Sequence, residues 1–98
     1  MGATELQINS KRLERAYDEI MGFLAVHKYE MKQSVKPVKI VAKRPRKGGI
    51  FRSDPNIKVG FWNKPEEGAT VVLIEWNRAG KGDALLIRDL LHSIGSKK

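Results

Sequence analysis

The chain has 98 residues, and 19 Lys and Arg against 11 Asp and Glu give a net charge of +8 at pH 7. This length favours a single domain over residues 1–98, and an apolar fraction of 41% is enough for one small core. The absence of cysteine excludes disulfide frameworks, thiolate metal sites and cysteine nucleophiles. Because the sequence shows neither a signal-peptide pattern nor an apolar run of about 18–20 residues, we expect a cytoplasmic protein with no membrane partner.

The positive charge is clustered. Residues 34–53 contain seven basic residues and no acidic one, and residues 78–98 contribute a further +3. Residues 1–33 are neutral, and residues 54–77 carry −2. Clustering of this kind is typical of a protein that binds a polyanion.

The first half of the chain predicts a tail, a helix, a strand and a loop. Residues 1–8 are expected as an N-terminal tail. Apolar residues three or four apart predict one amphipathic helix over residues 10–32, with Leu13, Tyr17, Ile20 and Leu24 in its apolar stripe. The alternating segment 38–43 predicts a strand. Residues 44–56 form a basic loop that turns at Asp54-Pro55.

The clearest element is a β-hairpin formed by residues 57–63 and 70–77, with Pro65 and Gly68 in the turn. Pairing Asn63 with Thr70 sets Trp62 opposite Val71, Gly60 opposite Leu73 and Lys58 opposite Glu75. One face of the hairpin is then entirely apolar, and the other is mixed. This contrast predicts one buried face and one open face.

Asp83 is the expected cap of a last helix over residues 84–94, and residues 96–98 form a basic tail. The predicted order is therefore helix, three strands, helix. It favours an α+β fold in which two helices cover one face of a three-stranded antiparallel sheet.

The candidate site residues are mainly cations. We expect the basic loop to bind phosphates, because each neutralised phosphate releases counterions. The segment from Arg78 to Asp83 could bind an anion at a helix start, although it lacks the GxxxxGK[ST] pattern of a P-loop. The predicted nucleic-acid contacts are Lys39, Lys43, Arg44, Arg46, Lys47, Arg52, Arg78 and Lys81.

Trp62 is expected on the open sheet face among lysines. An aromatic ring in that setting either stacks a base or anchors a homodimer, and the short chain favours the dimer. His27 and His92 have no second ligand at metal-binding spacing, so we expect no metal and no cofactor.

The order α-β-β-β-α, with a basic hairpin loop and a lysine at the start of the last helix, resembles a double-stranded RNA-binding domain. The Alu-binding proteins of the signal recognition particle share this order. In the RNA-binding family, the first helix and the first strand loop contact successive minor grooves, and lysines at the second helix start bind the intervening phosphates. The resemblance implies that Arg44, Arg46 and Lys47 take the loop position. It places Lys81, within GKGDA, at the helix start.

The chain also resembles restriction-endonuclease-like nucleases of the PD-(D/E)xK type. Pro55-Asn56 stands in the place of the proline–aspartate pair, and Glu75-Trp76-Asn77 in that of the glutamate–x–lysine run. Asn replaces both the metal-binding Asp and the Lys that helps to activate water, so we expect no catalysis.

The sequence thus predicts a non-catalytic nucleic-acid-binding module that prefers structured or double-stranded RNA to DNA and binds mainly through phosphates. One alternative is a protein-interaction module that docks an acidic partner or homodimerises through the open sheet face. A degenerate PD-(D/E)xK-like nuclease is the third.

Overall fold

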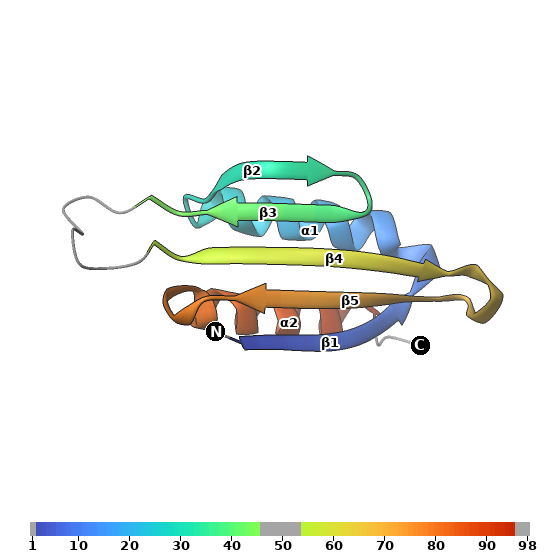
Figure 1. Ribbon diagram of the computed structural model, residues 1–98. Helices are drawn as coiled ribbons and strands as arrows, with labels where there is room; N and C mark the ends of the chain where they lie inside the picture. The colour runs from blue at the N-terminus through green and yellow to red at the C-terminus, as the bar shows by residue number, and fades with distance from the viewer. Residues whose placement is uncertain (1, 46–53, 96–98) are drawn as a thin grey trace.

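The computed structural model describes residues 2–45 and 54–95, which form one antiparallel sheet and two α-helices (Figure 1). The elements are β1 (Gly2–Asn9), α1 (Leu13–Val26), β2 (Glu30–Val35), β3 (Lys39–Lys43), β4 (Asn56–Lys64), β5 (Ala69–Trp76) and α2 (Lys81–Gly95). Short 3-10 turns occupy Ser10–Arg12, Pro65–Glu67 and Arg78–Gly80. The strand order across the sheet is β1-β5-β4-β3-β2.

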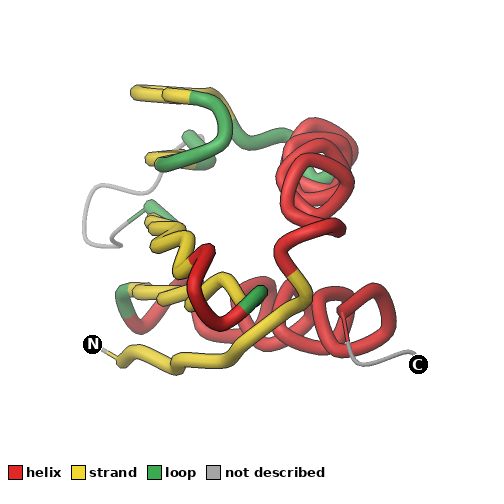
Figure 2. The backbone as a smooth tube through the Cα atoms, turned by 90° about the vertical axis from the view of Figure 1, so that its right-hand side faces the viewer, coloured by secondary structure: helices red, strands yellow, loops and turns green. Residues whose placement is uncertain are grey.

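Both helices lie on the same face of the sheet, and no described helix or strand covers the opposite face (Figure 2). The predicted register of the hairpin is confirmed, since Trp62 pairs with Val71 and Lys58 with Glu75. Its apolar face is buried beneath the helices and contributes Ile57, Val59, Phe61, Val72 and Ile74 to the core. The α+β class and the two helices are therefore confirmed.

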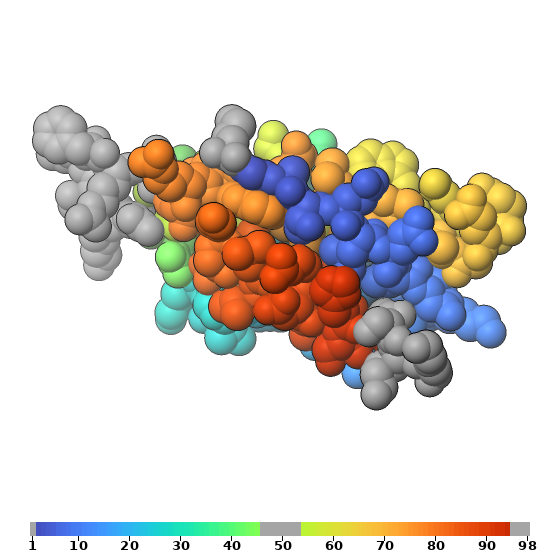
Figure 3. All heavy atoms as spheres, turned by 90° about the horizontal axis from the view of Figure 1, so that it is seen from below, coloured from blue at the N-terminus to red at the C-terminus, as the bar shows by residue number. Residues whose placement is uncertain are grey.

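The predicted three-stranded sheet is not confirmed, because the sheet has two further strands. Most of the expected tail is part of β1, which pairs along its whole length with β5 and lies beside α2 at the edge of the sheet (Figure 3). Leu6 and Ile8 are buried, whereas Glu5 before them and Gln7 between them are exposed. This alternation is the period of a strand with one buried face.

The second additional strand arises because α1 ends earlier than the predicted helix. Lys28 has a φ of 69°, the left-handed conformation that ends many helices. The amide of Lys28 donates to the carbonyl of Ala25 (3.1 Å), and that of Tyr29 donates to the carbonyl of Leu24 (2.9 Å). These two bonds form a Schellman motif, which usually has glycine where this chain has Lys28. The chain then reverses into β2.

The observed order is consequently β-α-β-β-β-β-α rather than α-β-β-β-α. The last helix also begins earlier than predicted, at Lys81 instead of residue 84. Asp83 is not its cap; it lies in the first turn and accepts a hydrogen bond from Tyr29. Neither helix of the described chain is long and apolar enough to cross a bilayer.

Truncation of the Ile74 side chain tests whether the apolar face of the hairpin is buried. Ile74 is fully buried in β5, between β1 and β4. Ile74→Ala should lower the free energy of unfolding by about 2–5 kcal/mol and Ile74→Val by about 0.5–1.5 kcal/mol, because each leaves a cavity. Urea unfolding measures both values. Val26→Ala is the control, since Val26 is 74% exposed; equal losses at both positions would contradict the assignment of the buried face.

Candidate nucleic-acid interface

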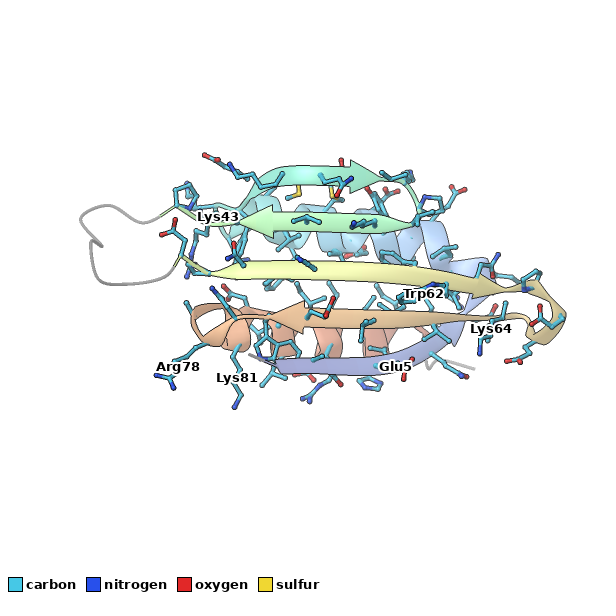
Figure 4. All side chains as sticks on the ribbon, viewed as in Figure 1. Glu5, Lys43, Trp62, Lys64, Arg78 and Lys81 are labelled. Carbon is cyan, nitrogen blue, oxygen red and sulfur yellow. The ribbon has the colours of Figure 1, made fainter. Side chains whose placement is uncertain are left out.

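Basic side chains from separate segments gather at one end of the sheet. At this end β3 and β5 finish and β4 begins. Lys43 ends β3 and Arg44 follows it, whereas Arg78 and Lys81 come from the turn after β5 and the start of α2. We call these four residues the basic end. Lys43, Arg78 and Lys81 are labelled in Figure 4.

Arg44 is held in place by two partners from other elements. Its guanidinium lies 5.4 Å from the centre of the Tyr29 ring and 3.7 Å from a carboxylate oxygen of Asp83. The Tyr29 hydroxyl donates to the same Asp83 oxygen at 2.7 Å. A cation over an aromatic face and beside a carboxylate is restricted in its rotamers. Arg44 therefore has a defined position before any ligand arrives.

The connection between β3 and β4 leaves and returns at the basic end. The amide of Arg44 donates to the carbonyl of Pro55 at 3.0 Å, and the Lys43 ammonium lies 3.6 Å from the Asp54 carboxylate. Both interactions join the two sides of the connection. The predicted contacts Arg46, Lys47 and Arg52 belong to this connection and lie outside the described residues.

Asn77 joins the start of β4 to the turn before α2. Its side-chain oxygen accepts hydrogen bonds from the amides of Asn56 and Gly80, both at 3.0 Å. Its side-chain nitrogen donates to the carbonyl of Asp54 at 2.7 Å. Gly80 packs so closely that a Cβ there would lie 2.8 Å from the carbonyl oxygen of Asn56. This close approach explains why the turn needs glycine. Through its three hydrogen bonds, Asn77 positions the segment that carries Arg78 and Lys81.

Arg78 and Lys81 are exposed, and neither forms an ion pair with a described residue. They point away from the sheet into solvent (Figure 4). Lys43 and Arg44, by contrast, each have a carboxylate nearby. The basic end thus combines two partnered cations with two that are available to an anion.

The eighth predicted contact, Lys39, lies elsewhere. It is at the other end of β3, on the open face, opposite Gly60 of β4. There it lines a hollow of 390 Å³ with Lys58, Trp62, Leu73 and Glu75 among its neighbours. Lys58 is not among the predicted site residues, although its alternation with Trp62 along β4 places both on the open face. Trp62 is on that face as predicted, with 55% of its surface exposed.

The residues that resemble a nuclease motif are spread over the same end of the sheet. Asn56 opens β4, and Glu75 is an exposed residue near the end of β5, opposite Lys58. Asp54 lies beside Lys43. Within the described ranges, no three His, Asp or Glu side chains are grouped so that they could hold a metal ion.

A comparison with known protein families and with curated protein sequences finds no match for this chain. Its function therefore has to be inferred from the arrangement of its own residues.

We predict that Asn77→Ala destabilises the fold by about 1–3 kcal/mol, because it removes three side-chain hydrogen bonds, to the amides of Asn56 and Gly80 and to the carbonyl of Asp54. The amide of Gly80 keeps its bond to the backbone carbonyl of Asn77. Asn77→Asp keeps the acceptor and loses the donor to Asp54, so its destabilisation should be smaller. Urea unfolding measures both, and hydrogen exchange at Gly80 reports the local effect. Equal stability of Asn77→Ala and the natural chain would show that Asn77 does not hold this turn.

Proposed function

We propose that this chain is a non-catalytic nucleic-acid-binding module that contacts phosphates through its basic end. The observation that carries the proposal is the convergence of cations from two segments far apart in the sequence, residues 43–44 and 78–81, at one end of the sheet. Three further predicted contacts follow Lys43 and Arg44 in the sequence, within the connection between β3 and β4: Arg46, Lys47 and Arg52. A surface of this kind attracts a polyanion, and counterion release makes its affinity steep in salt.

Partnered and unpartnered cations have different tasks in this proposal. Arg44, fixed by Tyr29 and Asp83, provides one donor group of set position. Arg78 and Lys81 extend into solvent and adjust to the spacing of the phosphates. Contacts of this type position a nucleic acid and do not read its sequence.

Structured or double-stranded RNA is the ligand to test first, with duplex DNA beside it. The preference for RNA depends on the order α-β-β-β-α, and the observed order β-α-β-β-β-β-α differs from it. What supports the proposal is therefore the charge, which suits the phosphates of either duplex. The two duplexes are compared at the same length and at two salt concentrations.

We predict that Arg78→Ala/Lys81→Ala weakens binding to duplexes of unrelated sequence to a similar extent. The slope of log affinity against log salt should fall by about one for each phosphate that is no longer neutralised, or about two in total. Fluorescence anisotropy at several salt concentrations measures both quantities. Arg44→Ala/Arg46→Ala/Lys47→Ala should act in the same direction.

The control removes two exposed cations from another part of the molecule, Lys11→Ala/Arg15→Ala, which lowers the net charge equally. If this variant loses as much affinity and slope as Arg78→Ala/Lys81→Ala, binding follows net charge alone and the basic end is not an interface. No binding by the natural chain at low salt would overturn the whole proposal.

We predict that the duplexes stay intact during incubation with the protein and Mg²⁺. The two Asn residues at positions 56 and 77 lack the charge needed to bind the metal and to activate water in the nuclease pattern. Gel analysis of labelled duplex with and without Mg²⁺ measures cleavage. Magnesium-dependent cleavage that Glu75→Ala abolishes would identify a nuclease instead.

A further inference from the structure

The open face of the sheet carries a hollow that the basic end does not include. Gly60 and Leu73 are cross-strand partners on β4 and β5, and Lys39 of β3 pairs with Gly60 on the other side. These three residues form one row across the face. Trp62 lies on β4 on one side of the row, and Lys58 lies on the other.

The ring of Trp62 lies over Gly60. A Cβ built on Gly60 would be 3.4 Å from two carbons of the indole, which is ordinary contact distance. The indole thus lies over Gly60, beside the space that a larger side chain there would fill, while 55% of Trp62 remains exposed. A glycine inside a strand often marks a place where another group approaches the backbone closely. An indole in this position offers a ligand a flat, half-exposed platform.

The platform is flanked by positive charge. Lys39 and Lys58 are both exposed, and neither forms an ion pair with a described residue, although Glu75 is the cross-strand partner of Lys58. An aromatic ring that shares one hollow with two available ammonium groups suits a ligand that joins a flat ring to negative charge. Nucleotides have this composition, and stacking on an aromatic side chain together with phosphate contacts is how single strands are bound.

A second copy of the chain fits the hollow less well. In a two-fold dimer the same patch meets itself. Pairing of the open faces around Trp62 would therefore bring Lys39 and Lys58 of both copies into one interface, where like charges oppose association. Glu75 is the only acidic residue lining this hollow in the described chain. The charge thus favours an anionic ligand over the homodimer that chain length alone suggested.

We propose that the hollow binds an unpaired base of a single-stranded nucleic-acid segment, with the base stacked on Trp62 and the adjoining phosphates on Lys39 and Lys58. This inference rests on the proposed function and adds a second contact to it. Trp62 is six residues along β4 from Asn56 at the basic end, or about 20 Å. Lys58 lies between the two. One nucleic acid with a paired part and an unpaired part can therefore contact both surfaces.

Three probes separate stacking from charge: a single-stranded oligothymidylate, an abasic strand of the same length and charge, and a blunt duplex. We expect Trp62→Ala to weaken binding of the oligothymidylate by about five- to a hundred-fold, the effect of removing the platform for one or more stacked bases. The abasic strand and the duplex should bind unchanged. Trp62→Phe should retain most of the affinity, because it keeps an aromatic face. In a Trp76→Phe background, the oligothymidylate should quench the fluorescence of Trp62 and the abasic strand should not.

Leu86→Ala is the matched control, because Leu86 is a large apolar residue on α2 with 50% of its surface exposed. It should leave all three affinities unchanged. Unaltered binding of oligothymidylate to Trp62→Ala, or an equal weakening for the abasic strand, would overturn the inference. A dimer in sedimentation equilibrium that Trp62→Ala converts to monomer would overturn it too, in favour of a second copy.

The failure of this inference and that of the proposed function leave different patterns. If Trp62→Ala has no effect and Arg78→Ala/Lys81→Ala weakens all three probes, the stacking site is wrong and the basic end stands. If only Trp62→Ala weakens oligothymidylate binding, the stacking site stands and the basic end does not bind the phosphates.

Discussion

The pairing register of β4 and β5 is the constraint on which the rest of this protein depends. Side chains alternate along a strand, so a slip by one residue would exchange the two faces of the hairpin. The turn secures the register, with Pro65 at its start and Gly68 in the left-handed conformation at φ 66°. Beside it, the buried Thr70 hydroxyl lies within hydrogen-bond distance of Ser10 and Asn63. This cluster joins the hairpin to the 3-10 turn Ser10–Arg12, which leads from β1 into α1.

The sequence predicts the elements whose signals are local and misses those whose signals are distant. The hairpin register and the exposure of Trp62 on the open face follow from alternation and turn residues, and both are confirmed. β1 is missed because only Leu6 and Ile8 mark its buried face and its partner β5 is far along the chain. β2 is missed because α1 is ended by Lys28 in the left-handed conformation, and a lysine does not mark a helix end in the sequence as a glycine would. Only when β1 and β2 are left out does the order become α-β-β-β-α, the order that resembles a double-stranded RNA-binding domain.

The candidate site is likewise predicted from the sequence only in part. Counting charges along the chain identifies Lys43, Arg44, Arg78 and Lys81, and the strand ends bring them together. Counting charges does not show which side chains lie next to each cation. Tyr29 and Asp83 meet at Arg44 only because the stop at Lys28 and the turn at Asn77 bring their segments to the same end. Lys58 is absent from the predicted contacts because the sequence places it opposite Glu75 in the hairpin, and this pairing accounts for its charge without a ligand.

The distinction between partnered and available cations bears on how binding energy is distributed. The ion pair of Lys43 with Asp54 is partly exposed and contributes little to stability, about 0–1 kcal/mol. The pair of Arg44 with Asp83 is more buried, with 31% and 17% of the two side chains exposed, and it fixes the position of Arg44. A long side chain that is already ordered loses less conformational entropy when a ligand binds. Arg44 has lost that freedom on folding, whereas Arg78 and Lys81 retain it. One fixed cation beside two adaptable ones can set the position of a phosphate backbone while tolerating variation in its shape. In the proposed function, such a surface would discriminate poorly between sequences, and finer selectivity would come from groups on the open sheet face, where Trp62 is 55% exposed.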